Sequence, residues 1–265
     1  MTKKAIGVFD SGLGGLTILN ALRRTLPHEN LIYFGDTANV PYGSKSKEAV
    51  TRLSLAIGRF LQEQNVKLIV VACNTASAQA LDELKKKLAV PVMGVIEPGA
   101  TKAVSVTKNG HIAVLGTEGT VNSKAYPKAL LKKLPNARII QQACPLFVPL
   151  VEENWTNKPA AELIAREYLL PIQQSRADTV ILGCTHYPVL KGVLSRILGE
   201  QVKLVDSADT LAEAAQVFLR KHHLAQTSGK GRITVYASDA PQRFKRLAQI
   251  LLADKISTVH LKKLL

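Results

Sequence analysis

Cysteines are scarce in this sequence, and long hydrophobic runs are missing. The 265 residues include three cysteines, and none of them belongs to a C-x-x-C pair, so neither a disulfide framework nor a metal site is indicated. No apolar stretch approaches the roughly 20 residues that a membrane span requires. Residues 1–6 lead directly into an expected strand and do not form a signal-peptide pattern. We therefore expect a protein of the reducing cytoplasm, with no metal and no membrane contact.

Acidic and aromatic residues are also few. Asp and Glu number 20 against 35 Lys and Arg, which gives a net charge of +15, and aromatic residues make up only 5%. A positive charge of this size is typical of proteins that bind polyanions. However, the lysines form small scattered groups, such as 85–87 and 132–133, and no aromatic residues alternate with them to stack on bases. We therefore expect no nucleic-acid partner, and a positive field that attracts a small anionic substrate.

Hydrophobic residues, in contrast, are plentiful at 46%, and they recur in two alternating patterns. Short apolar runs that are typical of buried strands lie at 5–9, 31–34, 68–72 and 92–95. Amphipathic segments that are typical of helices separate these runs, at about 16–27, 46–64 and 75–88. This strict alternation predicts a doubly wound parallel sheet.

The same pattern begins again in the second half of the chain. Residues 111–120 resemble 5–12, and the apolar run 179–183 ends in a cysteine as the run 68–72 does. We therefore predict an α/β fold of two similar doubly wound parallel-sheet domains, related by a pseudo-twofold axis, with the active site in the cleft between them. The strand and helix expected at 232–252 are left over and should return to the first domain. The predicted domains are 1–97 plus 208–265, and 98–207.

Two cysteines stand at corresponding strand ends. Cys73 and Cys184 each follow an apolar run directly, which is where ligands gather in open α/β sheets. Most free cysteines are simply small buried hydrophobic residues, but the matched contexts Cys-Asn-Thr and Cys-Thr-His favour a pair of reactive thiols. We expect Asn74 or Thr75 to cap the helix that follows Cys73, and His186 to exchange protons with Cys184. Asp10 also follows a strand directly, either as an acid/base group or as a turn cap.

A glycine-rich stretch offers an alternative function. Residues 12–15, Gly-Leu-Gly-Gly, follow the first strand, and Asp36 ends the second, which half resembles a dinucleotide-binding fingerprint and would indicate an oxidoreductase. Thr17 occupies the third glycine position, however, and Asp10 would place a negative charge beside the pyrophosphate. The motif also leaves the two cysteines unexplained. We consider this alternative weak.

Four stretches together carry a more specific resemblance. They are Gly7-Val8-Phe9-Asp10-Ser11-Gly12-Leu13-Gly14-Gly15, Gly35-Asp36 through Pro41-Tyr42-Gly43, Ala72-Cys73-Asn74-Thr75-Ala76 and Gly183-Cys184-Thr185-His186-Tyr187-Pro188. In these stretches the chain resembles the glutamate racemases, within the aspartate/glutamate racemase superfamily, essentially from end to end. The resemblance implies a cofactor-independent isomerase of the cytoplasm that interconverts L- and D-glutamate and supplies D-glutamate for peptidoglycan, and hence for the cell wall and cell shape. By the same resemblance we expect a homodimer.

The resemblance also assigns roles to residues. Cys73 and Cys184 would be the two acid/base groups, with Cys73 taking the proton from D-glutamate and Cys184 from L-glutamate. Asp10 and His186 would assist them, and Glu152 would be a further acidic residue near His186. The residues implied to bind the substrate are Asp10, Ser11, Pro41, Tyr42, Gly43, Asn74, Thr75, Thr117, Thr120, Thr185 and His186.

Racemisation fits the duplicated pattern, because one group must remove a proton from one face of the Cα atom while another delivers a proton to the opposite face. No lysine is marked for a Schiff base, so hydrogen bonds and electrostatics would have to stabilise the carbanion. Two other functions remain open at this point. An aspartate or hydantoin racemase would share the two-cysteine plan, and a basic interaction protein could use a racemase-like fold without activity.

Overall fold

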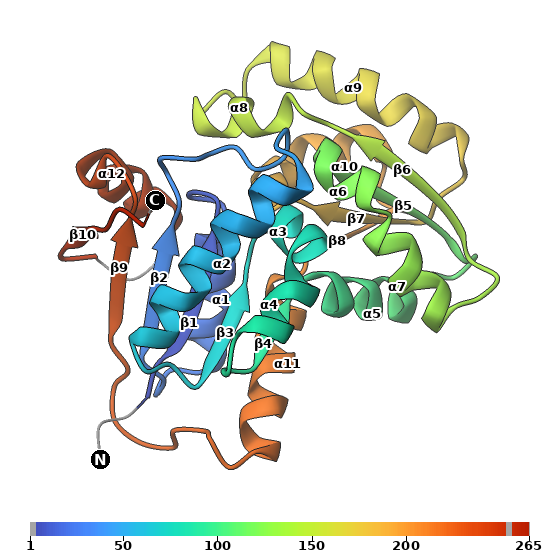
Figure 1. Cartoon of the computed structure of the whole chain (residues 1–265). Helices are drawn as coiled ribbons and strands as arrows, with labels where there is room; N and C mark the ends of the chain where they lie inside the picture. The colour runs from blue at the N-terminus through green and yellow to red at the C-terminus, as the bar shows by residue number, and fades with distance from the viewer. Residues whose placement is uncertain (1–3, 253–255, 265) are drawn as a thin grey trace.

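The computed structural model describes residues 4–252 and 256–264 of the chain. Its first sheet contains six parallel strands in the order β10-β9-β2-β1-β3-β4 (Figure 1). These strands are β1 (Ile6–Asp10), β2 (Leu31–Gly35), β3 (Leu68–Val71), β4 (Val92–Gly94), β9 (Ile233–Ala237) and β10 (Val259–Leu261). The predicted return of the C-terminal strand to this sheet is therefore confirmed for β9.

The second sheet is also parallel and has the order β6-β5-β7-β8. Its strands are β5 (His111–Gly116), β6 (Arg138–Ala143), β7 (Thr179–Gly183) and β8 (Lys203–Val205). The order matches β2-β1-β3-β4 of the first sheet strand for strand, as an internal duplication requires. Sequence reasoning missed β6, because its side chains are only partly buried and Gln141 and Gln142 interrupt any apolar run.

Helices connect the strands and cover the sheets (Figure 1). They are α1 (Leu16–Thr25), α2 (Lys47–Glu63), α3 (Asn74–Gln79), α4 (Leu81–Lys87), α5 (Ile96–Val106), α6 (Glu118–Ser123), α7 (Ala125–Lys133), α8 (Phe147–Glu152), α9 (Pro159–Gln174), the 3₁₀ turn η1 (Tyr187–Leu190), α10 (Lys191–Leu198), α11 (Ala208–Lys221) and α12 (Pro241–Leu251). None of the described helices is long and apolar enough to cross a membrane.

The helix predicted at 75–88 is in fact two helices, which meet at Ala80. Ser77 holds α3 at the strand ends, because its hydroxyl donates to the Val71 carbonyl and accepts from the Val95 N–H. The buried Leu84 of α4 packs instead toward α2, where Gly58 leaves room for it. The two segments therefore follow different partners and cannot share one axis.

One hydrophobic core joins the two sheets. Ile6 and Val8 of β1 lie in the same buried cluster as Ile112 and Val114 of β5, together with side chains of α1, α5, α7 and α11. The intervening residues, such as Phe9 and Leu115, point to the opposite face of each sheet and into separate clusters, as the two-residue period of a strand requires. The predicted domain boundaries fall near the starts of α5 and α11. They stay a prediction, because both helices contribute to the shared core.

Candidate active site

Cys73 and Cys184 lie at equivalent places in the two sheets. Cys73 follows the end of β3 after one residue, and Cys184 directly follows β7, which is the third strand of the corresponding order. Both side chains are buried, and both line one small cavity of about 20 Å³. A volume of this size holds about one water molecule, so the walls must separate before an amino acid can enter. Both thiols therefore lie at one cavity, as the sequence predicted.

Most of the residues implied by the resemblance line this cavity. The lining consists of Ser11, Val40, Pro41, Tyr42, Gly43, Cys73, Asn74, Thr75, Thr117, Val148, Cys184, Thr185 and His186. Asp10 and Thr120 are fully buried behind this lining, and Glu152 reaches His186 from α8. No lysine or arginine occurs among these lining residues, so the available donors are hydroxyls, the Asn74 amide, the His186 imidazole, the two thiols and backbone N–H groups.

The Cys73 thiol is held in a neutral, proton-retaining environment. Its sulfur accepts the N–H of Ala76 at 3.5 Å and donates to Ser11 Oγ at 3.8 Å. Cys73 is therefore itself the N-cap of α3, so the prediction that Asn74 or Thr75 caps this helix was wrong. Burial, and then the negative charge of Asp10, raises the pKa of Cys73 to about 12. Near neutral pH this cysteine is a thiol.

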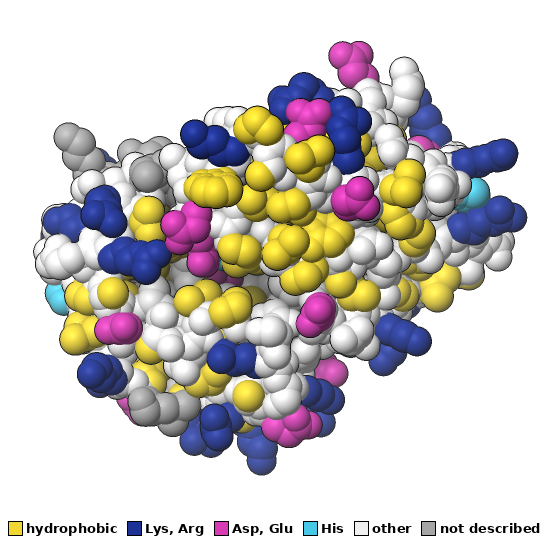
Figure 2. Space-filling view, turned by 90° about the horizontal axis from the view of Figure 1, so that it is seen from above, with side chains coloured by type: hydrophobic (Ala, Val, Ile, Leu, Met, Phe, Trp, Pro, Cys, Tyr) yellow, Lys and Arg dark blue, Asp and Glu magenta, His cyan; other side chains and the backbone are white. Residues whose placement is uncertain are grey.

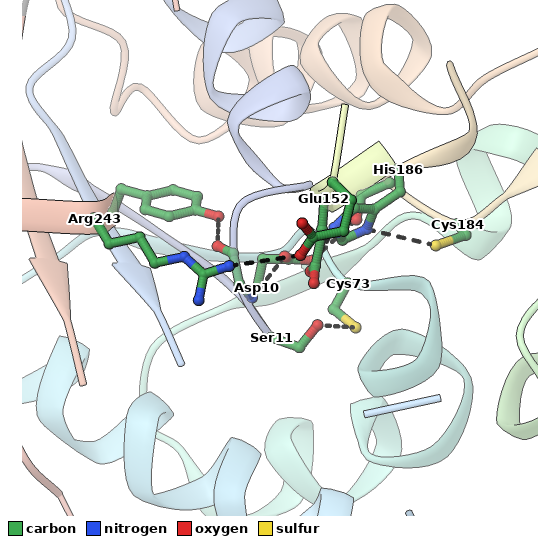
Figure 3. A network of polar contacts seen from close by, with 11 residues as sticks. Asp10, Ser11, Cys73, Glu152, Cys184, His186 and Arg243 are labelled. Atoms are coloured by element: carbon green, nitrogen blue, oxygen red, sulfur yellow. Dashed lines mark hydrogen bonds and ion pairs between the residues drawn. The ribbon is translucent and has the colours of Figure 1, made fainter. Parts of the chain in front are cut away.

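The Cys184 thiol has a charged neighbour instead. Its sulfur lies 3.8 Å from Nδ1 of His186, whose Nε2 lies 3.3 Å from Oε1 of Glu152. The contact with Glu152 is within ion-pair distance, although it does not have hydrogen-bond geometry. Burial alone would lower the pKa of His186, but the interactions with Cys184 and Glu152 outweigh it and raise the pKa to about 10. Figure 3 shows this imidazole between the thiol and the carboxylate.

Asp10 links the turn after β1 to the turn after β7, which carries Cys184. Its Oδ2 accepts the N–H of Gly12 at 2.9 Å, and its Oδ1 accepts the hydroxyl of Thr185 at 3.3 Å. The interpretation of Asp10 as a turn cap is thus confirmed, whereas its acid/base role stays a prediction. Burial raises the pKa of this carboxyl, and the nearby positive charge of His186 partly counteracts the rise.

The glycine-rich stretch 12–15 lets the turn after β1 approach the turn after β7 closely. A Cβ atom on Gly14 would lie 2.2 Å from Thr185 Oγ1 and 2.7 Å from His186 Nδ1. These distances are shorter than any tolerable contact, so only glycine lets the turn after β1 meet the turn after β7. Asp36 is likewise engaged within the protein, because it accepts hydrogen bonds from Tyr42 at 2.6 Å and Ser238 at 2.7 Å. Neither feature supports dinucleotide binding.

Two further sets of contacts shape the cavity wall. Asp36 holds the loop that contains the cis Val40–Pro41 peptide bond and presents Tyr42 and Gly43. On the adjoining side, Thr75 Oγ1 lies 2.8 Å from Thr117 Oγ1, and Thr117 donates to Thr120 at 3.0 Å. Thr120 supports Thr117 from behind and does not itself line the cavity.

Sequence reasoning missed several residues near the site. Tyr33 donates to the carbonyl of Gly12 at 2.8 Å, and Tyr126 donates to Oδ1 of Asn74 at 2.7 Å. Arg243 of α12 approaches the α8 side near Glu152 (Figure 3), and its Nη2 lies 3.9 Å from Oε1 of Glu153. Each of these side chains is distant in sequence from the residue it meets, so no local pattern marks it.

Comparison with known proteins identifies the family to which this site belongs. A family model described as Asp/Glu/Hydantoin racemase matches residues 15–215. The chain belongs to this racemase family. It is therefore an isomerase, and the resemblance noted in the four sequence stretches is confirmed.

Individual members of the family match along almost the whole chain. The glutamate racemase of Geobacter metallireducens is 51% identical over 98% of this chain and 97% of its own length. A glutamate racemase isoform from Bacillus anthracis superposes with a TM-score of 0.96 at 36% identity, covering 100% of this chain and 99% of the other. The glutamate racemase of Francisella tularensis, solved in complex with D-glutamate, gives a TM-score of 0.93 at 35% identity and the same coverage. These matches confirm the predicted fold class.

Proposed function

We propose that this racemase interconverts L- and D-glutamate by moving protons between Cα and two thiols, Cys73 and Cys184. The observation that carries the proposal is the placement of the two sulfurs at equivalent strand ends, on one cavity that hydrogen-bond donors line. The similarity to glutamate racemases over nearly the full length supports glutamate as the substrate.

Each turnover uses one thiolate and one thiol. In one direction Cys184, as a thiolate beside the protonated His186, removes the Cα proton and becomes a thiol. Cys73 then gives its own proton to the opposite face of the carbanion and becomes a thiolate. The reverse direction exchanges the two roles. The family resemblance implies that Cys184 faces the proton of L-glutamate.

The carbanion requires stabilisation without a lysine or arginine in the cavity wall. Hydroxyls of Ser11, Thr75 and Thr185 and the amide of Asn74 border the space between the two thiols. Preorganised donors of this kind stabilise developing charge without having to reorganise during the reaction. We infer that they bind the substrate carboxylates and that the reaction uses no cofactor. Activity should survive exhaustive dialysis against a chelator, and restoration of lost activity by a metal or by pyridoxal phosphate would contradict this inference.

A circular-dichroism assay on several amino acids tests the substrate. We expect glutamate to give the highest kcat/KM, well above aspartate. An equal or higher kcat/KM for aspartate, or activity on hydantoins alone, would contradict glutamate as the substrate. The absence of any racemisation would instead favour an interaction protein on this fold.

The cellular role and the assembly belong to the same proposal. We propose that the enzyme works in the cytoplasm, where it supplies D-glutamate for peptidoglycan, and depletion in its host should be rescued by D-glutamate. Figure 2 shows hydrophobic side chains gathered on one face, with Lys and Arg dispersed around its rim. Leu146, Trp155 and Leu163, at or near α8 and α9, are exposed, and they offer a surface for a homodimer, which light scattering would detect. The dispersed charge favours no nucleic-acid site.

A further inference from the structure

Tyr126 stands between the two cysteine turns and belongs to neither. It lies near the start of α7 and is completely buried in the core that joins the two sheets. Its hydroxyl donates to Oδ1 of Asn74 at 2.7 Å. Asn74 directly follows Cys73, so this hydrogen bond connects a helix of the second sheet to the first cysteine turn.

The ring of the same tyrosine packs against the second cysteine turn. A Cβ atom on Gly183, the residue before Cys184, would lie 3.1 Å from Cε2 of Tyr126. A Cβ atom on Gly99 of α5 would lie 3.3 Å from both the ring and the hydroxyl. Ser207, just before α11, places its hydroxyl 3.4 Å from the Tyr126 oxygen. The ring is therefore seated against Gly183 and against both segments through which the chain passes between the sheets.

In the structure the Asn74 amide is oriented with its oxygen toward Tyr126. Because Oδ1 accepts from Tyr126, Nδ2 is the group left without a partner among the described residues, and Asn74 lines the cavity. An amide N–H donates to a carboxylate, whereas an amide oxygen repels one. A rotated Asn74 would present the wrong group to an anionic substrate.

We propose that Tyr126 is a positioning residue for the reaction. It holds the Asn74 amide with its N–H groups toward the substrate carboxylate. Its own ring packs against Gly183, the residue before Cys184. The Tyr126 side chain thereby contacts both cysteine turns and holds them in a fixed relative position. This inference rests on the proposed function, in which Asn74 binds the substrate.

The test is a double-mutant cycle with Tyr126→Phe and Asn74→Ala in the full-length enzyme. The phenylalanine keeps the ring on Gly183 and removes only the hydroxyl. We expect kcat/KM for glutamate to fall roughly tenfold, mainly through a higher KM, because loss of one hydrogen bond to a binding group has about this effect. In the Asn74→Ala background the same substitution should change kcat/KM less than twofold. Tyr168→Phe is the control, since among the described residues that hydroxyl accepts only the N–H of Leu146 at 3.3 Å, and it should leave both constants unchanged.

Three outcomes would overturn the inference. The first is an equal cost of Tyr126→Phe with and without Asn74, since the hydroxyl would then act elsewhere. The second is a fall in melting temperature and in kcat with an unchanged KM, which a purely structural role would produce. The third is an Asn74→Ala enzyme with wild-type constants. In that case racemisation by the two thiols would still stand, but Asn74 would not be a substrate contact and Tyr126 would have nothing to position.

Discussion

The two cysteine turns occupy equivalent places in the fold but have different neighbours. The sulfur of Cys73 contacts a hydroxyl and a backbone N–H, and burial raises its pKa to about 12. The sulfur of Cys184 contacts the imidazole of His186, whose pKa rises to about 10. A protonated imidazole stabilises negative charge on an adjacent sulfur. The duplicated fold thus supplies two equivalent positions, and the local side chains give the two thiols different electrostatic surroundings.

This difference suits a reaction that needs one acid and one base at the same time. If both thiols were protonated there would be no base, and if both were ionised there would be no acid and two buried like charges. Substitutions at the two cysteines should disturb this asymmetry most, followed by those at His186, Glu152 and Asp10.

Replacement of either reactive cysteine should have the largest effect. In Cys73→Ser and Cys184→Ser an alcohol, a far poorer acid/base group near neutral pH, replaces the thiol, and racemisation should fall at least about 1,000-fold in both directions. The Cys144→Ser variant is a matched control, because this buried thiol shares the hydrophobic cluster of Cys184 but does not line the cavity, and it donates to the Gln142 carbonyl at 3.6 Å. It should keep its activity.

Exchange of the Cα proton in D₂O separates the two faces. In each serine variant the remaining thiolate can still exchange the proton of the enantiomer it faces, which NMR detects. We expect Cys73→Ser to exchange L-glutamate and Cys184→Ser to exchange D-glutamate. The same preference in both variants, or full racemase activity in either one, would refute the two-base proposal.

Removal of the imidazole should affect the Cys184 turn alone. His186→Gln keeps a polar side chain but loses the positive charge, and we expect kcat/KM to fall about 100-fold. In the wild type, His186 is protonated below its pKa of about 10, so activity should decline as the pH rises through that value. This decline should be missing in the variant. An unchanged alkaline limb of the pH profile would show that another group titrates there.

Glu152 should contribute less, because it contacts the imidazole and not the thiol. Oε1 lies 3.3 Å from Nε2 of His186, and the side chain is 27% exposed, so solvent weakens the interaction. Glu152→Gln should lower kcat/KM about tenfold and move the alkaline limb to lower pH, because a source of His186 stabilisation is lost. Glu153→Gln is the matched control, since this neighbouring carboxylate is 67% exposed and its one ion pair within the described part of the chain is with Arg243. Equal effects of the two substitutions would show that Glu152 acts only through the general surface charge and not through its contact with His186.

The sequence predicted the symmetric features of this molecule better than the asymmetric ones. Strand periodicity and the repeated Cys-containing turns placed Cys73 and Cys184 at corresponding strand ends, because such patterns are local. The family resemblance added the link from His186 to Glu152. The contacts of Tyr126 with Asn74 and of Asp10 with Thr185 escaped prediction, because they join residues from different sheets. The capping role of Cys73 also escaped, since capping rules favour oxygen-bearing side chains.

The smallest expected effect concerns Asp10, whose negative charge raises the pKa of one group in each cysteine turn. Its negative charge raises the pKa of the Cys73 thiol and also helps to keep His186 protonated. Asp10→Asn should therefore reduce the asymmetry, with a lower pKa at both groups and lower activity. Asparagine can still accept the N–H of Gly12 through its amide oxygen, so the turn after β1 should remain intact.

The stability of the same variant should change in the other direction. Burial raises the pKa of the folded-state Asp10 carboxyl above its unfolded value. Any stabilisation from this group is therefore fully present below the unfolded pKa and is lost as the pH rises through the folded pKa, because a buried charge must then be maintained. Asparagine does not titrate, so the variant should gain free energy of unfolding at pH 8, where wild-type Asp10 must keep a buried charge, and gain less at pH 4. Urea denaturation at both pH values measures this difference. A variant that is less stable than wild type at pH 8 would show that the carboxylate, through Thr185 and His186, holds the two turns together more strongly than burial opposes its charge.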